Sequence, residues 1–308
     1  MYGENADSSL VSKVGVPVHT FEEFLQLGGT KDEAAVATIS DRNRQVLPGH
    51  CALLIYTSGT TGPPKGAMIS HDNVTFSAKN TMESYFETNQ NERIVSYLPL
   101  SHIAAQVVDN FCPMYLAACT YFAQADALKG SLTTTLKEAR PTVFFAVPRV
   151  WEKIQEKMQA LGRETTGVKK MISTWAKGRG AAHMKECQYG ESGGKPWGYG
   201  CANAIALSKI KKALGLDAAK FCCVGAAPVA VETLEYFGSL GINIYEGFGQ
   251  SECSGLYTIN APGAWKVGTC GRPCPGTEGR IDEATGELCY TGRHIFMGYL
   301  YNEEKTRE

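Results

Sequence analysis

The 308-residue sequence lacks any large excess of charge, because 30 Lys and Arg residues face 31 Asp and Glu residues and leave a formal net charge of -1. A dedicated nucleic-acid-binding protein would have a clustered basic surplus, so this balance argues against nucleic acid as a partner. Hydrophobic residues form 44% of the chain and charged residues 20%, which excludes wholesale disorder. The sequence therefore predicts a globular protein with a sizeable core.

Regular cysteine spacing is also missing. The eleven cysteines include no CxxC pair, so we expect neither a zinc site nor a disulfide framework, and free thiols indicate a reducing, cytoplasmic compartment. The N-terminal residues MYGENADSSL show no basic stretch followed by an apolar run, so no secretory signal is visible. The most apolar window, residues 103–123, is interrupted by Gln106, Asp109, Asn110 and Pro113 and is too broken for a membrane span.

Short apolar runs alternate with longer amphipathic runs, a pattern typical of an α/β layer fold. We expect β-strands at residues 52–57, 94–98, 120–123, 142–147, 220–224 and 242–245. We expect helices at residues 74–86, 102–116, 132–139, 149–161, 169–177, 202–214 and 231–240. This order predicts largely parallel sheets with helices on both faces.

Local signals refine this outline. Ser131 is expected to cap the helix at 132–139, and Pro228 is expected to open the helix at 231–240 near its first turn. Residues 187–200 combine Gly, Pro and aromatic residues and predict a long surface loop. After Pro262 glycine, proline and short β-like pieces replace the helical pattern, which predicts the start of a β-rich subdomain.

A glycine-rich segment directly follows the first strand and reads Tyr56-Thr57-Ser58-Gly59-Thr60-Thr61-Gly62-Pro63-Pro64-Lys65-Gly66. Small residues let backbone N–H groups converge on an anion, while hydroxyl groups can bind phosphate or Mg²⁺ and Lys65 adds a positive charge. It is not a Walker loop, because Pro64 and Gly66 stand where that motif needs Gly and a hydroxyl. The segment predicts phosphate binding rather than a flexible linker.

This segment resembles the signature loop of the adenylate-forming superfamily, which includes acyl-CoA synthetases, luciferases and peptide-synthetase adenylation domains. Further strings follow in the family's order: Pro99-Leu100-Ser101-His102, Gly225-Ala226-Ala227-Pro228, Phe248-Gly249-Gln250-Ser251-Glu252, and Gly286-Glu287-Leu288 with Gly298-Tyr299. Residues 146–153 and 292–300 are similar to long-chain acyl-CoA synthetases, and the second string resembles the bubblegum-type members.

The resemblance implies an α/β fold corresponding to part of the large N-terminal lobe of these enzymes. It implies a long-chain fatty acid–CoA ligase that uses ATP, Mg²⁺ and coenzyme A and works through an acyl-adenylate. The catalytic residues would be Lys65, His102, Ser251 and Glu252, and the Mg²⁺ ligands would be Thr60 and Glu252. The residues implied to bind ATP are Thr57, Ser58, Gly59, Thr60, Thr61, Gly62, Lys65, Gly225, Ala226, Ala227, Pro228, Gly247, Phe248, Gly249, Gln250, Ser251 and Glu252.

Two of these assignments leave alternatives open. Phe248 would stack on the adenine ring where the superfamily usually has Tyr, or it is a core aromatic residue. His102 would lie beside the acyl carboxylate as a gate or phosphate contact, or it caps the helix that follows Pro99. Ser251 replaces the commoner Thr and keeps the hydroxyl that would face the α-phosphate.

The family's motif order also predicts domain bounds. Residues 1–50 would be a remnant of an upstream region, 51–260 the AMP-binding α/β core, and 261–308 the start of the β-rich subdomain. The C-terminal domain with the catalytic lysine of adenylation would be absent, so we expect the 308-residue chain alone to be largely inactive.

Two alternative functions remain. The first is an adenylate-forming ligase for an aryl or other carboxylic acid, and the second is a truncated, non-catalytic module that binds a nucleotide or an acyl group. The basic stretches Lys169–Lys170 and Lys209–Lys212 are expected to be solvated helix faces that leave room for peripheral membrane association.

Overall fold

The computed structural model describes residues 19–28, 32–57, 63–83 and 91–308 and divides the chain into two units, Met1–His50 and Cys51–Glu308. The first unit contains helices α2 (Phe21–Leu27) and α3 (Glu33–Gln45). The Thr20 side chain accepts a hydrogen bond from the Glu23 amide and caps α2. The Asp32 side chain accepts one from the Ala35 amide and caps α3. Neither helix was predicted from the sequence, and in α3 the apolar periodicity is weak and none of the described residues is buried.

The central sheet of unit Cys51–Glu308 has five strands in the order β5-β6-β7-β8-β9. Strands β5 (Val143–Ala146), β6 (Phe221–Val224) and β7 (Ile244–Phe248) pair in parallel. Strands β8 (Thr258–Ile259) and β9 (Arg272–Pro273) extend the sheet in the antiparallel sense. All four residues of β6 are buried, as expected for a strand covered on both faces.

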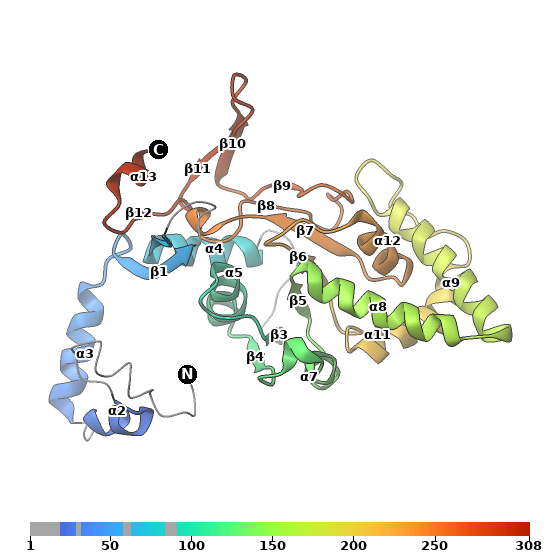
Figure 1. The fold of residues 1–308 in the computed structure, drawn as a ribbon, viewed down its shortest axis with the longest axis horizontal. Helices are drawn as coiled ribbons and strands as arrows, with labels where there is room; N and C mark the ends of the chain where they lie inside the picture. The colour runs from blue at the N-terminus through green and yellow to red at the C-terminus, as the bar shows by residue number, and fades with distance from the viewer. Residues whose placement is uncertain (1–18, 29–31, 58–62, 84–90) are drawn as a thin grey trace. The chain divides into compact units, whose positions relative to one another are not determined.

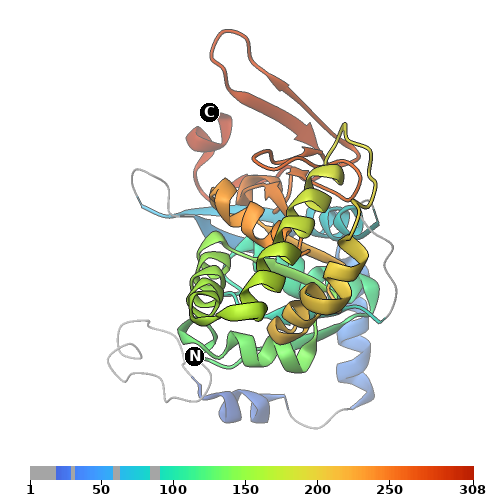
Figure 2. The same ribbon diagram turned by 90° about the vertical axis from the view of Figure 1, so that its right-hand side faces the viewer.

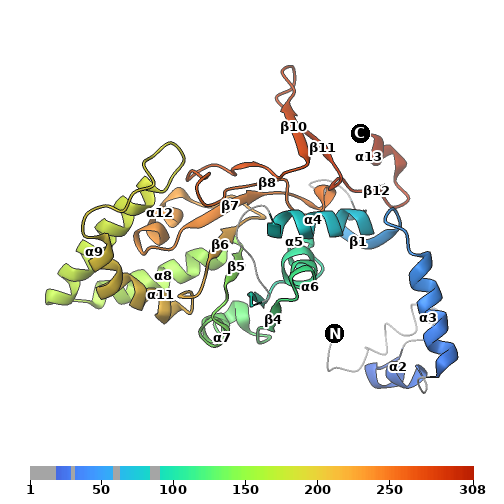
Figure 3. The same ribbon diagram turned by 180° about the vertical axis from the view of Figure 1, so that it is seen from behind.

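The two faces of this parallel core have different coverings (Figure 1). Phe144 and Val224 face a cluster that includes Trp151 and Phe237 and belongs to helices on one side of the sheet. These helices are α7 (Leu132–Ala139), α8 (Pro148–Glu164), α11 (Ser208–Leu214) and α12 (Val231–Ser239). Seen from the opposite side, the same helices flank β5 and β6 (Figure 3). Because strand residues alternate between faces, the neighbours of Phe144 point away from this helical layer.

Three smaller sheets complete the unit. An antiparallel sheet joins β1 (Cys51–Thr57), β2 (Lys65–Ser70) and β12 (Gly298–Tyr299). A parallel pair joins β3 (Arg93–Ser96) and β4 (Cys119–Phe122), and an antiparallel hairpin joins β10 (Thr277–Ile281) and β11 (Leu288–Gly292). The β10–β11 hairpin projects away from the rest of this unit (Figure 2).

The remaining helical elements include two π-helical segments that the sequence did not predict. They interrupt the helices expected at 102–116 and 202–214 and are η1 (Gln106–Phe111) and η3 (Asn203–Leu207). The other elements are α4 (His71–Glu83), α5 (Ile103–Ala105), α6 (Cys112–Leu116), η2 (Ala127–Lys129), α9 (Gly167–Glu186), α10 (Tyr199–Ala202), η4 (Ser251–Cys253) and α13 (Glu303–Arg307). In the described part of the chain, no helix has the length and hydrophobicity needed to cross a membrane.

Most predicted elements are confirmed with shifts of a few residues at their ends, but the helix expected at 169–177 extends to Glu186, and three further details were wrong. Ser131 does not cap α7, because it has helical backbone angles and its hydroxyl donates to Asp126 Oδ1 at 2.6 Å. Pro228 does not lie in the first turn of α12, whose N-cap is Ala230. The loop expected at 187–200 ends earlier, because α10 begins at Tyr199.

Candidate functional site

A cavity of about 420 Å³ lies against the face of the central sheet that α7, α8, α11 and α12 leave free. Alternate residues of β5 and β6 line it, because Val143, Phe145, Phe221 and Cys223 point away from the helical layer. Its other apolar walls come from α4, α5, η1 and the segment after η4. These residues are Met82, Ile103, Ala104, Val107, Val108, Leu256 and Ile259. The interior is therefore suited to an apolar ligand.

Polar side chains and exposed backbone gather at one part of the same cavity. They are Thr57, Lys65, Thr81, His102, Gln250, Ser251 and Glu252, together with the backbone of Gly225, Ala226, Gly247, Gly249 and Gly255. Thr57 and Lys65 lie opposite each other in the β1–β2 pair, where Thr57 Oγ1 donates to the Lys65 carbonyl at 3.4 Å. One cavity thus combines an apolar interior with a cation, a carboxylate and hydroxyl groups.

Tyr299 connects the cation to the carboxylate. Its hydroxyl donates to Glu252 Oε1 at 2.6 Å, and Lys65 Nζ lies 4.4 Å from the centre of its ring. Burial, and then the hydrogen bond to Glu252, raise the pKa of Tyr299, so the phenol stays protonated and donates. The Glu252 carbonyl also accepts from the Phe296 amide at 3.0 Å, which fixes the backbone on both sides of this contact.

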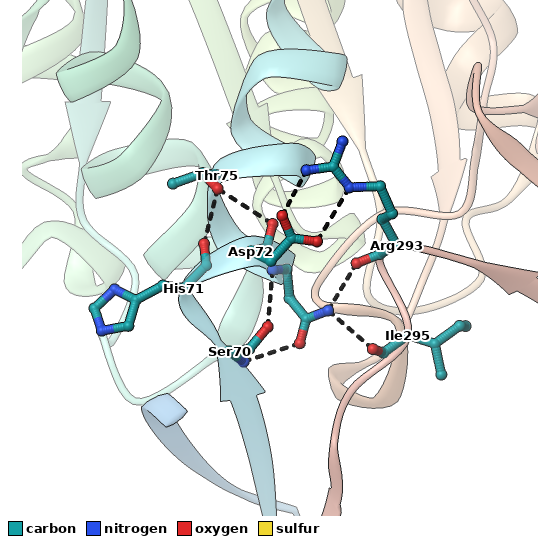
Figure 4. A network of polar contacts seen from close by, with 7 residues as sticks. Ser70, His71, Asp72, Thr75, Arg293 and Ile295 are labelled. Carbon is teal, nitrogen blue, oxygen red and sulfur yellow. Dashed lines mark hydrogen bonds and ion pairs between the residues drawn. The ribbon is translucent and has the colours of Figure 1, made fainter. Parts of the chain in front are cut away.

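A polar network holds the segment that leads to Tyr299 against the start of α4 (Figure 4). Asn73 Nδ2 donates to the carbonyls of Arg293 and Ile295 at 2.7 and 2.9 Å, and Arg293 forms a two-point ion pair with Asp72. The Ser70 amide donates to Asn73 Oδ1 at 2.9 Å, and the Asn73 amide donates to the Ser70 hydroxyl at 3.1 Å. Residues more than 200 positions apart in sequence thereby place Tyr299 beside β2.

The predicted site residues other than Phe248 fall into three groups. Ten of them line the cavity, namely Thr57, Lys65, His102, Gly225, Ala226, Gly247, Gly249, Gln250, Ser251 and Glu252. Ala227 and Pro228 follow directly but are not part of its lining. Ser58, Gly59, Thr60, Thr61 and Gly62 lie outside the described residues. The catalytic, ATP-binding and metal-binding roles stay predictions.

Phe248 does not face this cavity. Its side chain is 37% exposed and lines a second hollow of about 500 Å³ with Tyr257, Cys270 and Leu288. An aromatic ring at this place remains accessible to a flat ligand, so stacking on adenine stays a prediction. Gln250, two residues on, donates to the Tyr290 hydroxyl, and burial raises the pKa of Tyr290 to about 12.

His102 fits both of the interpretations that the sequence left open. Its Nδ1 accepts a hydrogen bond from the Ala104 amide at 3.1 Å and so caps α5, while the residue also lines the cavity. Because Nδ1 is an acceptor here, the ring hydrogen of the neutral tautomer is on Nε2. A cap in this position fixes the ring orientation at the cavity wall.

Backbone geometry singles out one glycine and one alanine of the predicted motifs. A Cβ atom on Gly249 would lie 1.6 Å from the Gly255 carbonyl oxygen, so this turn has no room for a side chain. Ala226 adopts a φ of 69°, a left-handed conformation that costs energy for a non-glycine residue. Backbone packing therefore requires glycine at position 249.

Tyr299 and the apolar walls were not predicted as parts of the site. Gly298-Tyr299 was noted only as part of a motif, and its distance of 47 positions from Glu252 gave no sign of the contact. Asp109 does not line the cavity, but its burial was also not predicted. It is 7% exposed on η1, and burial raises its pKa to about 7. A π-helical segment beside a cavity often marks a functional place in a protein, and this signal is visible only in the structure.

Comparison with known families decides the classification. The family model for "AMP-binding enzyme" matches residues 4–300. The chain belongs to the AMP-binding enzyme family. This confirms the predicted adenylate-forming superfamily and the α/β fold class.

Curated relatives place the chain within the branch that the motifs indicated. Over 298 residues the chain is 46% identical to the long-chain-fatty-acid–CoA ligase ACSBG2 of Xenopus laevis. This match covers 94% of the chain and 40% of that protein. The chain is 39% identical over 298 residues to the long-chain-fatty-acid–CoA ligase ACSBG1 of Homo sapiens, with 94% and 40% covered. The resemblance to the bubblegum-type ligases is thus confirmed. The chain spans about two fifths of the length of these relatives.

Solved structures show the same fold at lower identity. The crystal structure of apo MatB from Rhodopseudomonas palustris matches with a TM-score of 0.59 at 20% identity, over 85% of this chain and 43% of that one. This likeness supports the architecture of unit Cys51–Glu308.

Proposed function

We propose that the whole protein is an ATP-dependent long-chain fatty acid–CoA ligase. The observation that supports this most is the single cavity whose apolar interior opens beside Lys65, Ser251 and Glu252. A fatty acid has an apolar tail and one carboxylate, and such a cavity can bury the tail while the carboxylate meets the polar groups. Membership of the family and the names of its relatives agree with this assignment.

The proposed reaction has two displacements. A carboxylate oxygen attacks the α-phosphorus of ATP, the bond from that phosphorus to the bridging oxygen breaks, and pyrophosphate leaves. The thiolate of coenzyme A then attacks the acyl carbon, and AMP leaves with the acyl C–O bond pair. Lys65 would neutralise phosphate charge, and Ser251 would donate to the α-phosphate, because charge developing there needs fixed donors. His102, held by its cap to Ala104, would lie beside the carboxylate.

Mg²⁺ is the metal that this donor set fits. Glu252 offers a carboxylate at the cavity, and Mg²⁺ is usually bound by one or two protein oxygens together with substrate phosphates. The described residues contain no cluster of three metal-ligating side chains, which agrees with a metal that arrives with ATP. Thr60, the second proposed ligand, lies outside the described residues. When bound, the ion would offset charge on the leaving pyrophosphate.

The test of the activity is ATP–pyrophosphate exchange by the full-length protein with a panel of fatty acids of increasing chain length. Exchange that depends on long-chain acids supports the proposal. Exchange with aryl acids alone would establish the alternative ligase, and no exchange with any acid would leave a non-catalytic binding module. The 308-residue chain is assayed in parallel for acyl-CoA formation from palmitate.

Tyr299→Phe tests the polar part of the site in the 308-residue chain. The substitution keeps the ring beneath Lys65 but removes the hydroxyl that donates to Glu252. Because a hydrogen bond to a charged group contributes about 1.5 kcal/mol or more, we expect Mg²⁺-ATP to bind about tenfold more weakly by isothermal titration. Tyr301→Phe is the matched control, since Tyr301 is 99% exposed. Equal weakening in both variants would contradict the role of Tyr299.

We also propose a cytoplasmic location with peripheral membrane association. All eleven cysteines are free, which is the state expected in a reducing compartment. Long-chain fatty acids partition into bilayers, so a ligase that takes them gains from proximity to a membrane surface.

A further inference from the structure

Helices α8 and α9 follow each other in the chain at one end of unit Cys51–Glu308 (Figure 1). The buried residues of α8 lie in its first half and end at Ile154, and those of α9 begin at Ala176. The residues from 155 to 175 include none that is buried. The two helices therefore share no buried apolar core near the turn that joins them.

A hollow of about 340 Å³ lies between these two helices. Its eight lining residues include no apolar side chain and no acid. Three are the cations Arg163, Lys170 and Lys177, three carry hydroxyl groups, namely Thr165, Ser173 and Thr174, and the other two are a glutamine and a glycine. One arginine and two lysines give the lining a charge of +3 at neutral pH. A hollow lined by one sign of charge concentrates ions of the opposite sign.

Acidic side chains do not neutralise these three cations. Among the described residues, no carboxylate lies within ion-pair distance of Arg163, Lys170 or Lys177. Lys177 Nζ lies 5.1 Å from the centre of the Tyr236 ring, a contact that orients the ammonium group and leaves its charge in place. Burial lowers the pKa of Lys177, as expected for a cation that no nearby carboxylate stabilises. An anion in the hollow would stabilise all three charges.

The first turn of α9 gives a second, independent reason for an anion at this place. It contains no acidic residue, and Thr166 at the N-cap makes no side-chain hydrogen bond to the helix. Lys169 and Lys170 stand near this end instead. Positive charge is unfavourable there, because the amide groups at a helix N-terminus already carry partial positive charge. An anion held by Lys170 would offset this charge.

The hollow is separate from the cavity described above. Helix α8 belongs to the layer on one side of the central sheet, and the cavity lies on the other side. A ligand between α8 and α9 is therefore not part of the reaction that we propose for the cavity.

We propose that this hollow is a separate anion site that binds a diphosphate group. Lys170 and Lys177 are seven residues apart, so their Cα atoms lie about 10.5 Å apart along α9, and two linked phosphate groups span this distance better than one. The Ser173 and Thr174 hydroxyls lie between them on the same face and can donate to phosphate oxygens. Arg163 faces them from the α8 side and can donate two parallel hydrogen bonds to one phosphate.

Isothermal titration of the 308-residue chain with inorganic pyrophosphate tests the proposal, without Mg²⁺ or fatty acid and at constant ionic strength. We expect pyrophosphate to bind at least tenfold more tightly than inorganic phosphate. Lys170→Gln with Lys177→Gln should weaken pyrophosphate binding about a hundredfold, and Arg163→Gln about tenfold, because each removes charge-assisted hydrogen bonds. These variants remove repulsion between cations, so they should melt no lower than the unaltered chain. No binding of pyrophosphate would overturn the proposal.

Lys157→Gln with Lys169→Gln is the matched control. It removes the same charge from the same two helices at exposed lysines that do not line the hollow. We expect its affinity for pyrophosphate to stay within about twofold of the unaltered chain. A loss equal to that of Lys170→Gln with Lys177→Gln would mean that overall charge sets the affinity, and would overturn the site.

Lys65→Gln separates the hollow from the cavity, since pyrophosphate is also a product of the proposed reaction. Binding that persists in Lys65→Gln and is lost in Lys170→Gln with Lys177→Gln supports the hollow, and the reverse pattern would overturn it. Titration of Lys65→Gln with ADP then distinguishes the source of the diphosphate. ADP binding that depends on the two lysines indicates a nucleotide ligand, and binding of pyrophosphate alone indicates the free anion. None of these measurements uses ATP–pyrophosphate exchange, so the site and the proposed function fail separately.

Discussion

Asp109 is the residue whose ionisation the fold opposes most clearly. Its carboxyl is 7% exposed on η1, and within the described residues its Oδ2 atom has no hydrogen-bond partner. Burial raises the pKa of Asp109 from 3.8 to about 7, and the Ser96 hydroxyl opposes this rise. The folded state therefore retains a proton that the unfolded chain releases, so folding stability is complete below about pH 4 and falls as pH rises through about 7.

Asp109→Asn should remove that pH dependence. At about pH 8 the variant is expected to be more stable than the unaltered chain by up to about 4 kcal/mol, and near pH 4 the two should be alike. Urea unfolding across this range measures the difference. Asp282→Asn is a control with the opposite pH dependence. Backbone amides of Thr285 and Ala284 lower the pKa of this exposed carboxyl, so the stability that the Asp282 carboxylate contributes is lost as pH falls. A gain at pH 4 equal to that at pH 8 would refute the assignment to ionisation.

At the same scale, the sequence could predict residue types better than their partners. The string at residues 248–252 indicated Ser251 and Glu252, and both line the cavity with Lys65. The contact of Glu252 with Tyr299 could not be predicted, because it depends on β12 joining β2 and on the Asn73 network. Phe248 shows the same limit, since strand alternation turns it away from its neighbours at the cavity.

Among the elements, α9 depends on close contact with α12. A Cβ atom on Gly180 would lie 2.0 Å from the Ser239 carbonyl oxygen at the end of α12, and this backbone atom cannot move aside alone. We expect Gly180→Ala to lower the free energy of unfolding by about 1–3 kcal/mol through overpacking. Gly178→Ala is the matched control on the same helix, because no atom lies within 4 Å of its added Cβ.

The control should change stability in the opposite direction. Alanine favours a helix interior over glycine by about 0.5–1 kcal/mol, so Gly178→Ala is expected to stabilise. Urea unfolding of both variants at one pH gives the comparison. Equal effects of the two substitutions would mean that helix propensity, and not the approach of α12, decides the stability of α9.

Helical periodicity predicted most of these elements but not their irregular parts. The expected helix at 102–116 has the right extent, yet η1 interrupts it where Val107 and Asp109 must both be accommodated against buried neighbours. Strand β2 escaped prediction because its first residue, Lys65, belongs to the glycine-rich motif that was interpreted as phosphate-binding. In α9 the apolar spacing of 168, 171, 172 and 175 is readable in the sequence, but whether that stripe faces a core or solvent is a tertiary property.

At the scale of the whole molecule, the cavity is lined by segments that lie far apart in the sequence. Its lining runs from Thr57 to Ile259 and joins β1, α4, η1, β5, β6 and β7. Motif order predicted that several of these segments meet, but not the volume or the apolar walls, which depend on how η1 packs against β5 and β6. A ligand in this cavity contacts segments from several parts of unit Cys51–Glu308 at once.

Ligand binding should therefore stabilise this unit as a whole. A ligand that binds only the folded state adds about 2.7 kcal/mol at a concentration of 100 times its Kd, which corresponds to a rise in Tm of roughly 5–10 °C for a domain of this size. We expect such a rise for Mg²⁺-ATP and for palmitate in thermal unfolding followed by circular dichroism, and a smaller rise for ATP with a chelator. A rise with ATP but none with saturating palmitate would assign the cavity to the nucleotide alone, because a buried acyl tail must stabilise the walls that it contacts.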